Sequence, residues 1–445
     1  MNSPHVLYLH SHDTGRYVAP CGYDVPTPHL QRLAGEGILF RQAFCANPTC
    51  SPSRASLLTG QWAHSCGMGG LVNRGWSLPR PERLLPRVLA AAGYRTVRAG
   101  LQHVVSDPAE GGYERILDDG RPVEERAAAF LGERHDRPFF LDVGFTATHR
   151  RGRGFDPPPE GEEPTDPRFV QPPAPLPDAP EIRRDMASYI DAARTLDGQM
   201  GRVLAALEAS GLGGETLVIC TTDHGLAFPL MKCNLTDHGL GVMLILRGPG
   251  GLEGGRAVDG LASQIDLFPT ICEVAGLGRP DWLQGVSLLP LVEGRRQVRE
   301  EVFAEINYHV CHEPQRAVRT RRWKYIRRLH PRARPVLPNC DDSPTKDYLL
   351  ARGWGEREEA SERLYDLAAD PLEQRNVAAD AAHAEALAGM RGRLLRWQRE
   401  TGDPLLDRPF LEPPASAVVA DPEALSPRTA PTFPAREFLE ARSRG

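Results

Sequence analysis

Short apolar runs alternate with longer amphipathic segments along the first two thirds of the chain. The runs predict buried strands at residues 5–11, 94–99, 138–145, 216–222 and 242–246. Apolar residues at helical spacing predict helices between them, at 28–34, 51–59, 82–92, 124–133, 185–210 and 266–275. Strands and helices that alternate in this way build a mainly parallel sheet sandwiched by helices. We therefore predict an α/β fold.

The pattern changes near residue 295. Short strands are expected beyond it, at 302–306, 316–320, 323–327 and 363–367, followed by a helix over 379–399. A chain of 445 residues also exceeds one ordinary core. We predict an α/β domain over 1–295, a smaller α+β domain with an antiparallel sheet over 296–402, and a proline-rich tail over 403–445 that either wraps the surface or is mobile.

Composition narrows the classes of function. With 25% charged residues and a net charge of -5, the chain has no basic field, so nucleic acid is not expected as a partner. No apolar run is long enough to cross a bilayer, and no signal peptide is evident, so no membrane partner is expected. The nine cysteines show no repeated spacing, which favours a reducing, cytoplasmic location over a disulfide framework.

Polar residues follow several predicted strands where each one ends. Asp13, His103, His149 and the pair Asp223-His224 hold such positions. Each alone is more typical of a helix cap or a structural histidine. Because the carboxyl ends of parallel strands share one edge of a sheet, we expect these side chains to converge on a site.

The stretch at residues 50–60 is the strongest chemical signal. Ser51 is a suitable N-cap and Gly60 a suitable stop, which places Cys50 at the N-terminus of a short helix. Unpaired N–H groups there favour an anion, and Arg54 adds a positive charge. A cysteine considered alone is more often a buried structural thiol.

This stretch, C-S-P-S-R-A-S-L-L-T-G, resembles the signature of the type I sulfatases of the alkaline phosphatase superfamily, in which the cysteine is oxidised to formylglycine. Similar motifs lie at residues 27–34, 222–225, 266–270 and 364–373. The H-S-C-G-M run at 64–68 and the first residues of the chain look most like the heparan N-sulfatase (sulfamidase) branch and its bacterial relatives.

The resemblance implies a role for each matching residue. It implies one divalent cation, with ligands at His12, Asp13, Cys50, Asp223 and His224. Arg54 matches the residue that steadies formylglycine, and His103, His149 and Lys232 match the groups that hold sulfate and handle protons. Substrate contacts are assigned to loop residues, namely His64, Asn73 and His312. A formylglycine-generating enzyme of the host is the implied partner.

The implied reaction begins with attack by the hydrated formylglycine on sulfur, helped by the metal. His149, with Lys232 nearby, is expected to protonate the leaving group. His103 would then take the proton of the second hydroxyl, so that sulfate leaves and the aldehyde returns.

Two positions depart from the family pattern. His12 stands where a second aspartate is usual, so Ca²⁺ is expected but Mn²⁺ or Zn²⁺, which tolerate imidazole, stay open, as does a His12 that points away. Leu101 replaces the usual lysine of G-K-x-H, which removes one positive charge.

Three functions are open at this point. The first is hydrolysis of a sulfate ester or sulfamate, with a small-molecule or saccharide substrate. The second is a phosphonate monoester or phosphodiester hydrolase of the same superfamily. The third is a catalytically lapsed binding protein, for which Leu101 is the main support.

Overall fold

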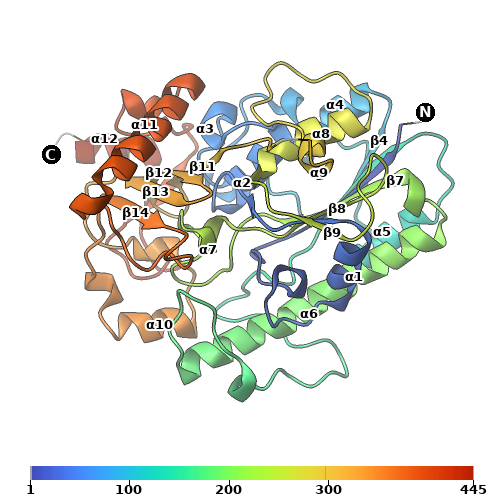
Figure 1. The fold of residues 1–445 in the computed structure, drawn as a ribbon. Coiled ribbons are helices and arrows are strands. Elements are labelled where there is room, and N and C mark those ends of the chain that lie inside the picture. Colours follow the sequence, from blue (N-terminus) through green and yellow to red (C-terminus); the bar gives the residue numbers. More distant parts are fainter. Residues whose placement is uncertain (1–2, 296, 444–445) are drawn as a thin grey trace.

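The computed structural model describes residues 3–295 and 297–443, and its centre is an eight-stranded sheet. The strands follow the order β5-β4-β6-β1-β7-β8-β2-β9 (Figure 1). β8 pairs antiparallel with both neighbours, while the other pairings are parallel. The bounds are β1 His5–Ser11, β2 Ile38–Phe40, β4 Arg95–Gly100, β5 Arg115–Leu117, β6 Phe139–Gly144, β7 Thr216–Thr222, β8 Leu244–Arg247 and β9 Arg256–Val258. The predicted mainly parallel sheet is confirmed.

Both faces of the sheet are covered, as Figure 1 shows. Side chains of β1 alternate between two apolar cores, because neighbouring residues of a strand point to opposite faces. Leu7 and Leu9 pack with α1 Pro28–Glu36, α5 Val123–Leu131 and α6 Pro180–Ala209. Val6 and Tyr8 pack with α2 Cys50–Thr59, α4 Leu85–Ala91 and α8 Leu267–Val274. The two helical layers therefore sandwich the sheet.

The C-terminal part carries a separate antiparallel sheet. Its strands are β11 Glu301–Tyr308, β12 His312–Thr320, β13 Trp323–Arg328 and β14 Glu362–Asp366. The helix α11 Ala384–Thr401 lays Leu387, Met390, Leu394 and Trp397 against it. The predicted antiparallel C-terminal sheet is confirmed, while the exact division at 295 and 402 stays a prediction.

Short elements complete the chain. They are β3 Ala43–Phe44, β10 Ala262–Ser263, α3 Ala63–Cys66, α7 Asp237–Leu240, α9 Leu289–Val292, α10 Pro344–Leu350, β15 Val418–Ala420, β16 Thr432–Pro434 and α12 Ala435–Ser443. The segment after residue 402 buries Leu411 and Val419 against the body of the protein. Asp403, the first aspartate of this segment, is buried. Its two carboxylate oxygens accept hydrogen bonds from Nε and Nη2 of Arg316, at 2.7 and 2.9 Å.

Several helices begin a few residues away from their predicted starts, including α4 and α11, and the reason is clear for α6 and α2. α6 begins at Pro180, because proline at the first position and Glu181 in the first turn both suit a helix start. α2 begins at Cys50 with Thr49 as N-cap, not with Ser51. The Ser51 hydroxyl instead accepts a hydrogen bond from the N–H of Val72 at 3.1 Å, so tertiary contacts decide the start.

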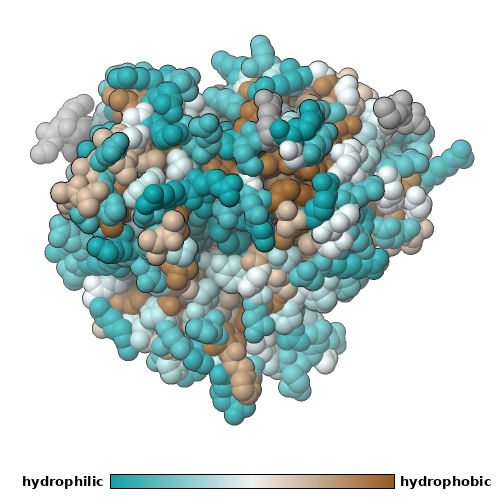
Figure 2. All heavy atoms as spheres, viewed as in Figure 1, coloured by the Kyte–Doolittle hydropathy of each residue, from teal (hydrophilic) through white to brown (hydrophobic). Residues whose placement is uncertain are grey.

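The face shown in Figure 2 is mostly hydrophilic. Among the described residues, large apolar side chains with over a third of their surface exposed are scattered, and they are Ile116, Phe169, Leu372, Leu406, Leu425 and Phe433. The part of the chain that the structure describes contains no helix with the length and apolar content that a membrane crossing requires.

Candidate active site

The site forms where four neighbouring parallel strands end. Asp13 follows β1, Asp223 follows β7, His149 follows β6 and His103 follows β4. These strands lie side by side in the order β4-β6-β1-β7. The sheet therefore brings together residues that are more than 200 positions apart, as the strand-end pattern predicts.

Five side chains form one buried cluster at this edge. One ligand atom from each lies within 4.8 Å of the others, and the five residues are His12, Asp13, Cys50, Asp223 and His224. The backbone N–H of Asp13 donates to Asp223 Oδ1 at 2.8 Å, which holds the Asp223 carboxylate against the backbone at the end of β1. His224 Nε2 is 3.3 Å from Asp13 Oδ1 and has no hydrogen-bond partner among the described residues.

This donor set fits a divalent cation. Two buried carboxylates whose oxygens lie within 4.8 Å repel each other unless positive charge stands between them. Burial opposes their ionisation, but Lys232 beside Asp13, and His224 beside Asp223, are the leading charges that hold the pKa of each carboxyl well below its usual range. The free nitrogen of His224 adds a ready ligand.

His12 turns into the cluster. Its Nδ1 is 2.9 Å from Asp13 Oδ1 and 3.2 Å from Asp223 Oδ2. Burial lowers the pKa of His12 to about 4, against the pull of Asp223 and Asp13. Of the two orientations left open by the sequence, the inward one is observed.

Cys50 opens α2 and is 3% exposed. Burial raises the pKa of its thiol far above the usual value. One turn later, Arg54 Nη2 donates to Asp223 Oδ2 at 3.0 Å and to the Ser11 carbonyl at 2.9 Å. The hydroxyl of Ser53 donates to the Asp223 carbonyl at 2.6 Å, so the helix is attached directly to the end of β7.

Lys232 reaches the cluster from the loop after β7. Its Nζ lies 3.1 Å from Asp13 Oδ2 and 3.1 Å from Asp341 Oδ2. Although burial disfavours its charge, Asp13 and Asp341 hold the pKa of Lys232 well above its usual value. The next N–H, of Cys233, donates to the Pro48 carbonyl at 3.0 Å, which ties this loop to the segment before Cys50.

Two further histidines border the cluster. His149 Nε2 is 3.9 Å from Asp13 Oδ2, and its side chain is 40% exposed. The ring of His103 lies 6.2 Å from that of His12, and its buried Nδ1 has no partner in the described part of the chain. His103 has φ 55°, as Asp13 has φ 57°, and such left-handed backbone at non-glycine residues is typical of functional sites.

The three residues predicted to bind substrate lie outside the cluster. His64 is buried, and its Nδ1 is 2.8 Å from Glu305 Oε1 of the C-terminal sheet, which indicates a structural contact. Asn73 is exposed in the turn Val72–Arg74, directly after the residue bonded to Ser51. His312 starts β12 with its ring 4.8 Å from that of Tyr308. Substrate binding by these residues stays a prediction.

Sequence reasoning missed Asp341, which pairs with Lys232. It lies in a loop between β13 and α10 with no motif around it. The loop is held by Asn339, whose Oδ1 accepts from the N–H groups of Val310 and Cys311 at 3.0 and 2.8 Å. Only the docking of this loop on the β11–β12 hairpin brings Asp341 to the site.

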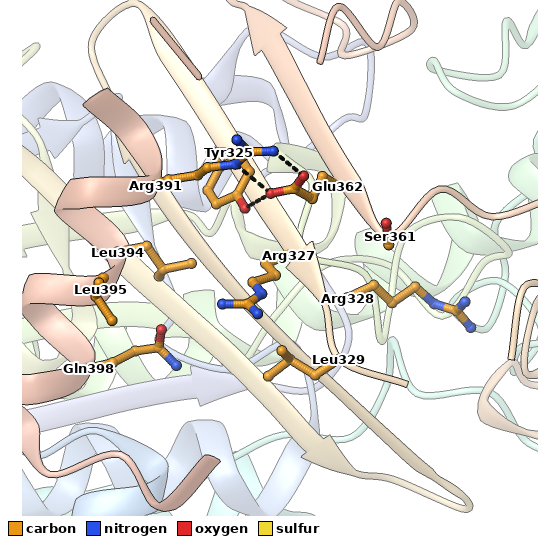
Figure 3. Close-up of a pocket in the computed structure, with 10 residues that line it drawn as sticks. All are labelled: Tyr325, Arg327, Arg328, Leu329, Ser361, Glu362, Arg391, Leu394, Leu395 and Gln398. Carbon is orange, nitrogen blue, oxygen red and sulfur yellow. Dashed lines mark hydrogen bonds and ion pairs between the residues drawn. The ribbon is translucent and has the colours of Figure 1, made fainter. Parts of the chain in front are cut away.

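A cavity of about 580 Å³ lies on the C-terminal sheet, away from these residues. Figure 3 shows Arg391 and Tyr325 meeting Glu362 on one side of it. None of the predicted site residues lines this cavity. It is distinct from the cluster.

Two family models match parts of this chain. A family model described as Sulfatase matches residues 4–277, and one described as N-sulphoglucosamine sulphohydrolase, C-terminal, matches residues 230–334. The chain belongs to the sulfatase family. This sulfatase is 32% identical to human N-sulphoglucosamine sulphohydrolase, over 86% of its own length and 88% of the relative.

Solved structures share its fold. A 2-O GAG sulfatase superposes with a TM-score of 0.70 at 22% identity, covering 98% of this chain and 100% of that one. A phosphonate monoester hydrolase of Agrobacterium radiobacter has a TM-score of 0.69 at 22% identity, covering 89% and 96%. The family identifies this sulfatase as a hydrolase of sulfate esters or sulfamates.

Proposed function

We propose that this sulfatase acts through a formylglycine made from Cys50. The observation that supports the proposal is the position of Cys50, which starts α2 with its ligand atom within 4.8 Å of those of the two carboxylates and two imidazoles. The N–H groups at a helix N-terminus and the guanidinium of Arg54 favour an anion at this point. A formylglycine here would supply the hydroxyl that attacks sulfur.

We propose one divalent cation at the cluster, with Ca²⁺ expected and Mn²⁺ or Zn²⁺ open. When bound, it would neutralise the charge of the sulfate oxygens and of the attacking oxygen. Asp13 and Asp223 would hold it as carboxylates, and His224 would hold it through its free Nε2. Lys232, fixed between Asp13 and Asp341, would contact a sulfate oxygen.

The departing alcohol or amine needs a proton. His149 is our candidate general acid, because its side chain is partly exposed while Nε2 remains 3.9 Å from Asp13 Oδ2. His103, with its unpartnered buried Nδ1, is our candidate for accepting a proton when sulfate leaves. Leu101 adds no charge, and Arg54 and Lys232 supply the positive charge of the site.

We propose a sulfated saccharide as substrate, because the human relative acts on N-sulphoglucosamine by its name. Conversion of Cys50 would require a formylglycine-generating enzyme in the host. We further propose a reducing, cytoplasmic location and the three-part division at residues 295 and 402.

The proposal can be tested by several measurements on one preparation of the purified protein. Peptide mass spectrometry around residue 50 would measure conversion of the thiol, and ion chromatography would measure sulfate released from N-sulfated and O-sulfated glucosamine. An aryl phosphonate would be assayed beside them. We expect formylglycine and sulfate release. Unconverted Cys50 in an active enzyme, or faster turnover of the phosphonate, would contradict the proposal.

A further inference from the structure

His10 is a polar residue inside an apolar strand. It belongs to β1 and is 2% exposed. Its ring stacks on Tyr8 at 4.7 Å, and space for it exists because residue 144 is glycine. A Cβ at Gly144 would lie 2.6 Å from Cε1 of His10. The core therefore accommodates this imidazole closely.

Both ring nitrogens of His10 have a partner. Nδ1 lies 2.5 Å from Arg54 Nη1, and Nε2 lies 2.7 Å from Asp142 Oδ1. A guanidinium can only donate, so Nδ1 must accept and the ring proton must sit on Nε2, where it is donated to Asp142. The contacts require one tautomer of the neutral ring.

The carboxylate behind His10 is itself fixed. Asp142 lies in the central strand β6, and its second oxygen accepts from the hydroxyl of Tyr113. The guanidinium of Arg98 lies 6.0 Å from the centre of the Tyr113 ring. Asp142 thus cannot turn away from His10 without breaking the hydrogen bond to the half-buried Tyr113 hydroxyl.

Arg54 is held by its two terminal nitrogens. Nη1 meets His10, while Nη2 donates to the Ser11 carbonyl and to Asp223 Oδ2. The Nε of Arg54 is buried and has no hydrogen-bond partner among the residues described. Residues four apart lie on the same side of a helix, which places Cys50 on the side of α2 that carries Arg54.

We propose that His10, supported by Asp142, is a positioning residue that holds the guanidinium of Arg54 against Asp223 and leaves its Nε–H for the group at position 50. The proposal rests on the proposed function of Cys50. It differs from a direct Asp142–Arg54 ion pair because the neutral imidazole separates the two charges. Arg54 therefore remains available to Asp223 at the cluster.

The kinetic test compares two changes at one position. His10→Leu removes both hydrogen bonds, whereas His10→Gln keeps one acceptor and one donor. We expect His10→Leu to lower kcat by about 10–100-fold with little change in KM, and His10→Gln to recover most of that loss. His5→Leu, at the opposite end of β1, is the matched control and should keep its activity. Equal losses in His10→Leu and His10→Gln would overturn the proposal.

A double variant separates positioning from stability. If His10 acts through Arg54, His10→Leu adds nothing to the loss caused by Arg54→Lys. Losses that multiply would overturn the proposal. The unfolding midpoint of each variant shows whether it is folded at the assay temperature.

A third measurement does not depend on activity. In protein labelled with ¹⁵N-histidine, we expect His10 to show the Nε2–H tautomer by NMR in wild type, and the Nδ1–H tautomer would overturn the proposal. A wild-type enzyme that releases no sulfate would instead contradict the proposed function, whatever tautomer His10 shows.

Discussion

At the scale of single residues, each buried charge of the site is stabilised by a neighbouring charge of opposite sign. Asp13 touches Lys232 and approaches His149, while Asp223 touches Arg54. Removing one member leaves a buried charge unpaired, which costs more than the contact itself contributes. Substitutions must therefore be read with a measurement of folding beside the measurement of activity.

Replacement of Cys50 is the most direct residue-scale prediction. Cys50→Ala should lower sulfate release by at least about 10³-fold, because the other hydroxyls of this turn, on Ser51 and Ser53, are already bonded to the backbone of Val72 and Asp223. The assay is sulfate release under saturating substrate. Cys50→Ser is the matched variant, since it places one hydroxyl at position 50 but cannot form an aldehyde hydrate. Turnover of Cys50→Ala near the wild-type rate would rule out the role.

Replacement of His149 should depend on the leaving group. For a sugar alcohol or amine, His149→Gln should lower kcat by about 10²–10⁴-fold, because the departing group must be protonated. For a nitrophenyl sulfate, whose leaving group needs no proton, the loss should be much smaller. The two substrates serve as controls for each other. An equal loss on both would assign His149 to sulfate binding instead.

At the scale of elements, α7 connects the cluster to the C-terminal sheet. The carboxylate of Asp237, its first residue, forms ion pairs with Nζ of Lys324 at 2.9 Å and with Nε of Arg319 at 3.2 Å. Its Gly239 carbonyl accepts from the N–H of Gly225 at 2.8 Å, next to His224. Glu373 accepts a hydrogen bond from the N–H of Asp237 and is buried.

Glu373 should make stability depend on pH. Burial raises the pKa of Glu373 from 4.5 to about 7, with Asp237 adding to the rise against the opposing pull of Lys324. The folded state then binds more protons than the unfolded state, so stability present below pH 4.5 is lost as the pH rises towards 7. In Glu373→Gln this loss should disappear.

Urea unfolding at a series of pH values measures this effect. The free energy of unfolding of wild type should fall relative to Glu373→Gln by on the order of 2 kcal/mol between pH 5 and pH 8. Glu358→Gln, in an exposed loop, is the control. Parallel pH profiles of wild type and Glu373→Gln would contradict the assigned shift.

At the scale of the whole molecule, buried ion pairs join distant parts of the chain. Arg316 of β12 is fully buried and forms a two-point contact with Asp403, where the C-terminal segment begins. His64 and Glu305 join α3 to β11. The site lies within this joined structure, because Asp341 of the C-terminal part reaches Lys232.

Breaking the contact with Asp403 should destabilise the fold. Asp403→Asn removes the two-point partner of buried Arg316 and leaves it only the longer contact with Glu305, at 3.6 Å. The change should cost up to about 3–5 kcal/mol in the free energy of unfolding. The exposed Asp407→Asn should change it by less than about 0.5 kcal/mol. Urea titration compares them, and equal midpoints would show that the pair adds nothing to stability.

Removal of the cation should affect the whole molecule as well as the reaction. A ligand at a thousandfold excess over its dissociation constant stabilises the folded state by about 4 kcal/mol, so chelation should lower Tm and activity together. Ca²⁺ should restore both, and elemental analysis would identify the metal in the untreated protein. Recovery with Mn²⁺ or Zn²⁺ alone would favour nitrogen ligation by His12. Full activity in metal-free protein would contradict the proposal.

Residue order alone was enough to predict the α/β fold class, five strands of the large sheet and the strand ends at Asp13, His149 and Asp223, because burial imposes periodicity and parallel strands end at one edge. It missed the three-residue strands β2, β5 and β9, which are too short to show a periodic pattern. It did not locate the start of α2, where Thr49 replaces Ser51 as cap. Caps compete within one or two residues of each other, and tertiary contacts choose between them.

Only the tertiary structure decided which isolated polar residues meet. Asp341 has no motif, and His10 and Asp142 are single polar positions in apolar strands. His64, which belongs to a motif, lies against Glu305 of the C-terminal sheet, a contact that no local pattern indicates. Local sequence determines which element a residue joins, whereas contact between residues far apart depends on how sheets, helices and loops pack, and that information is spread over the whole chain.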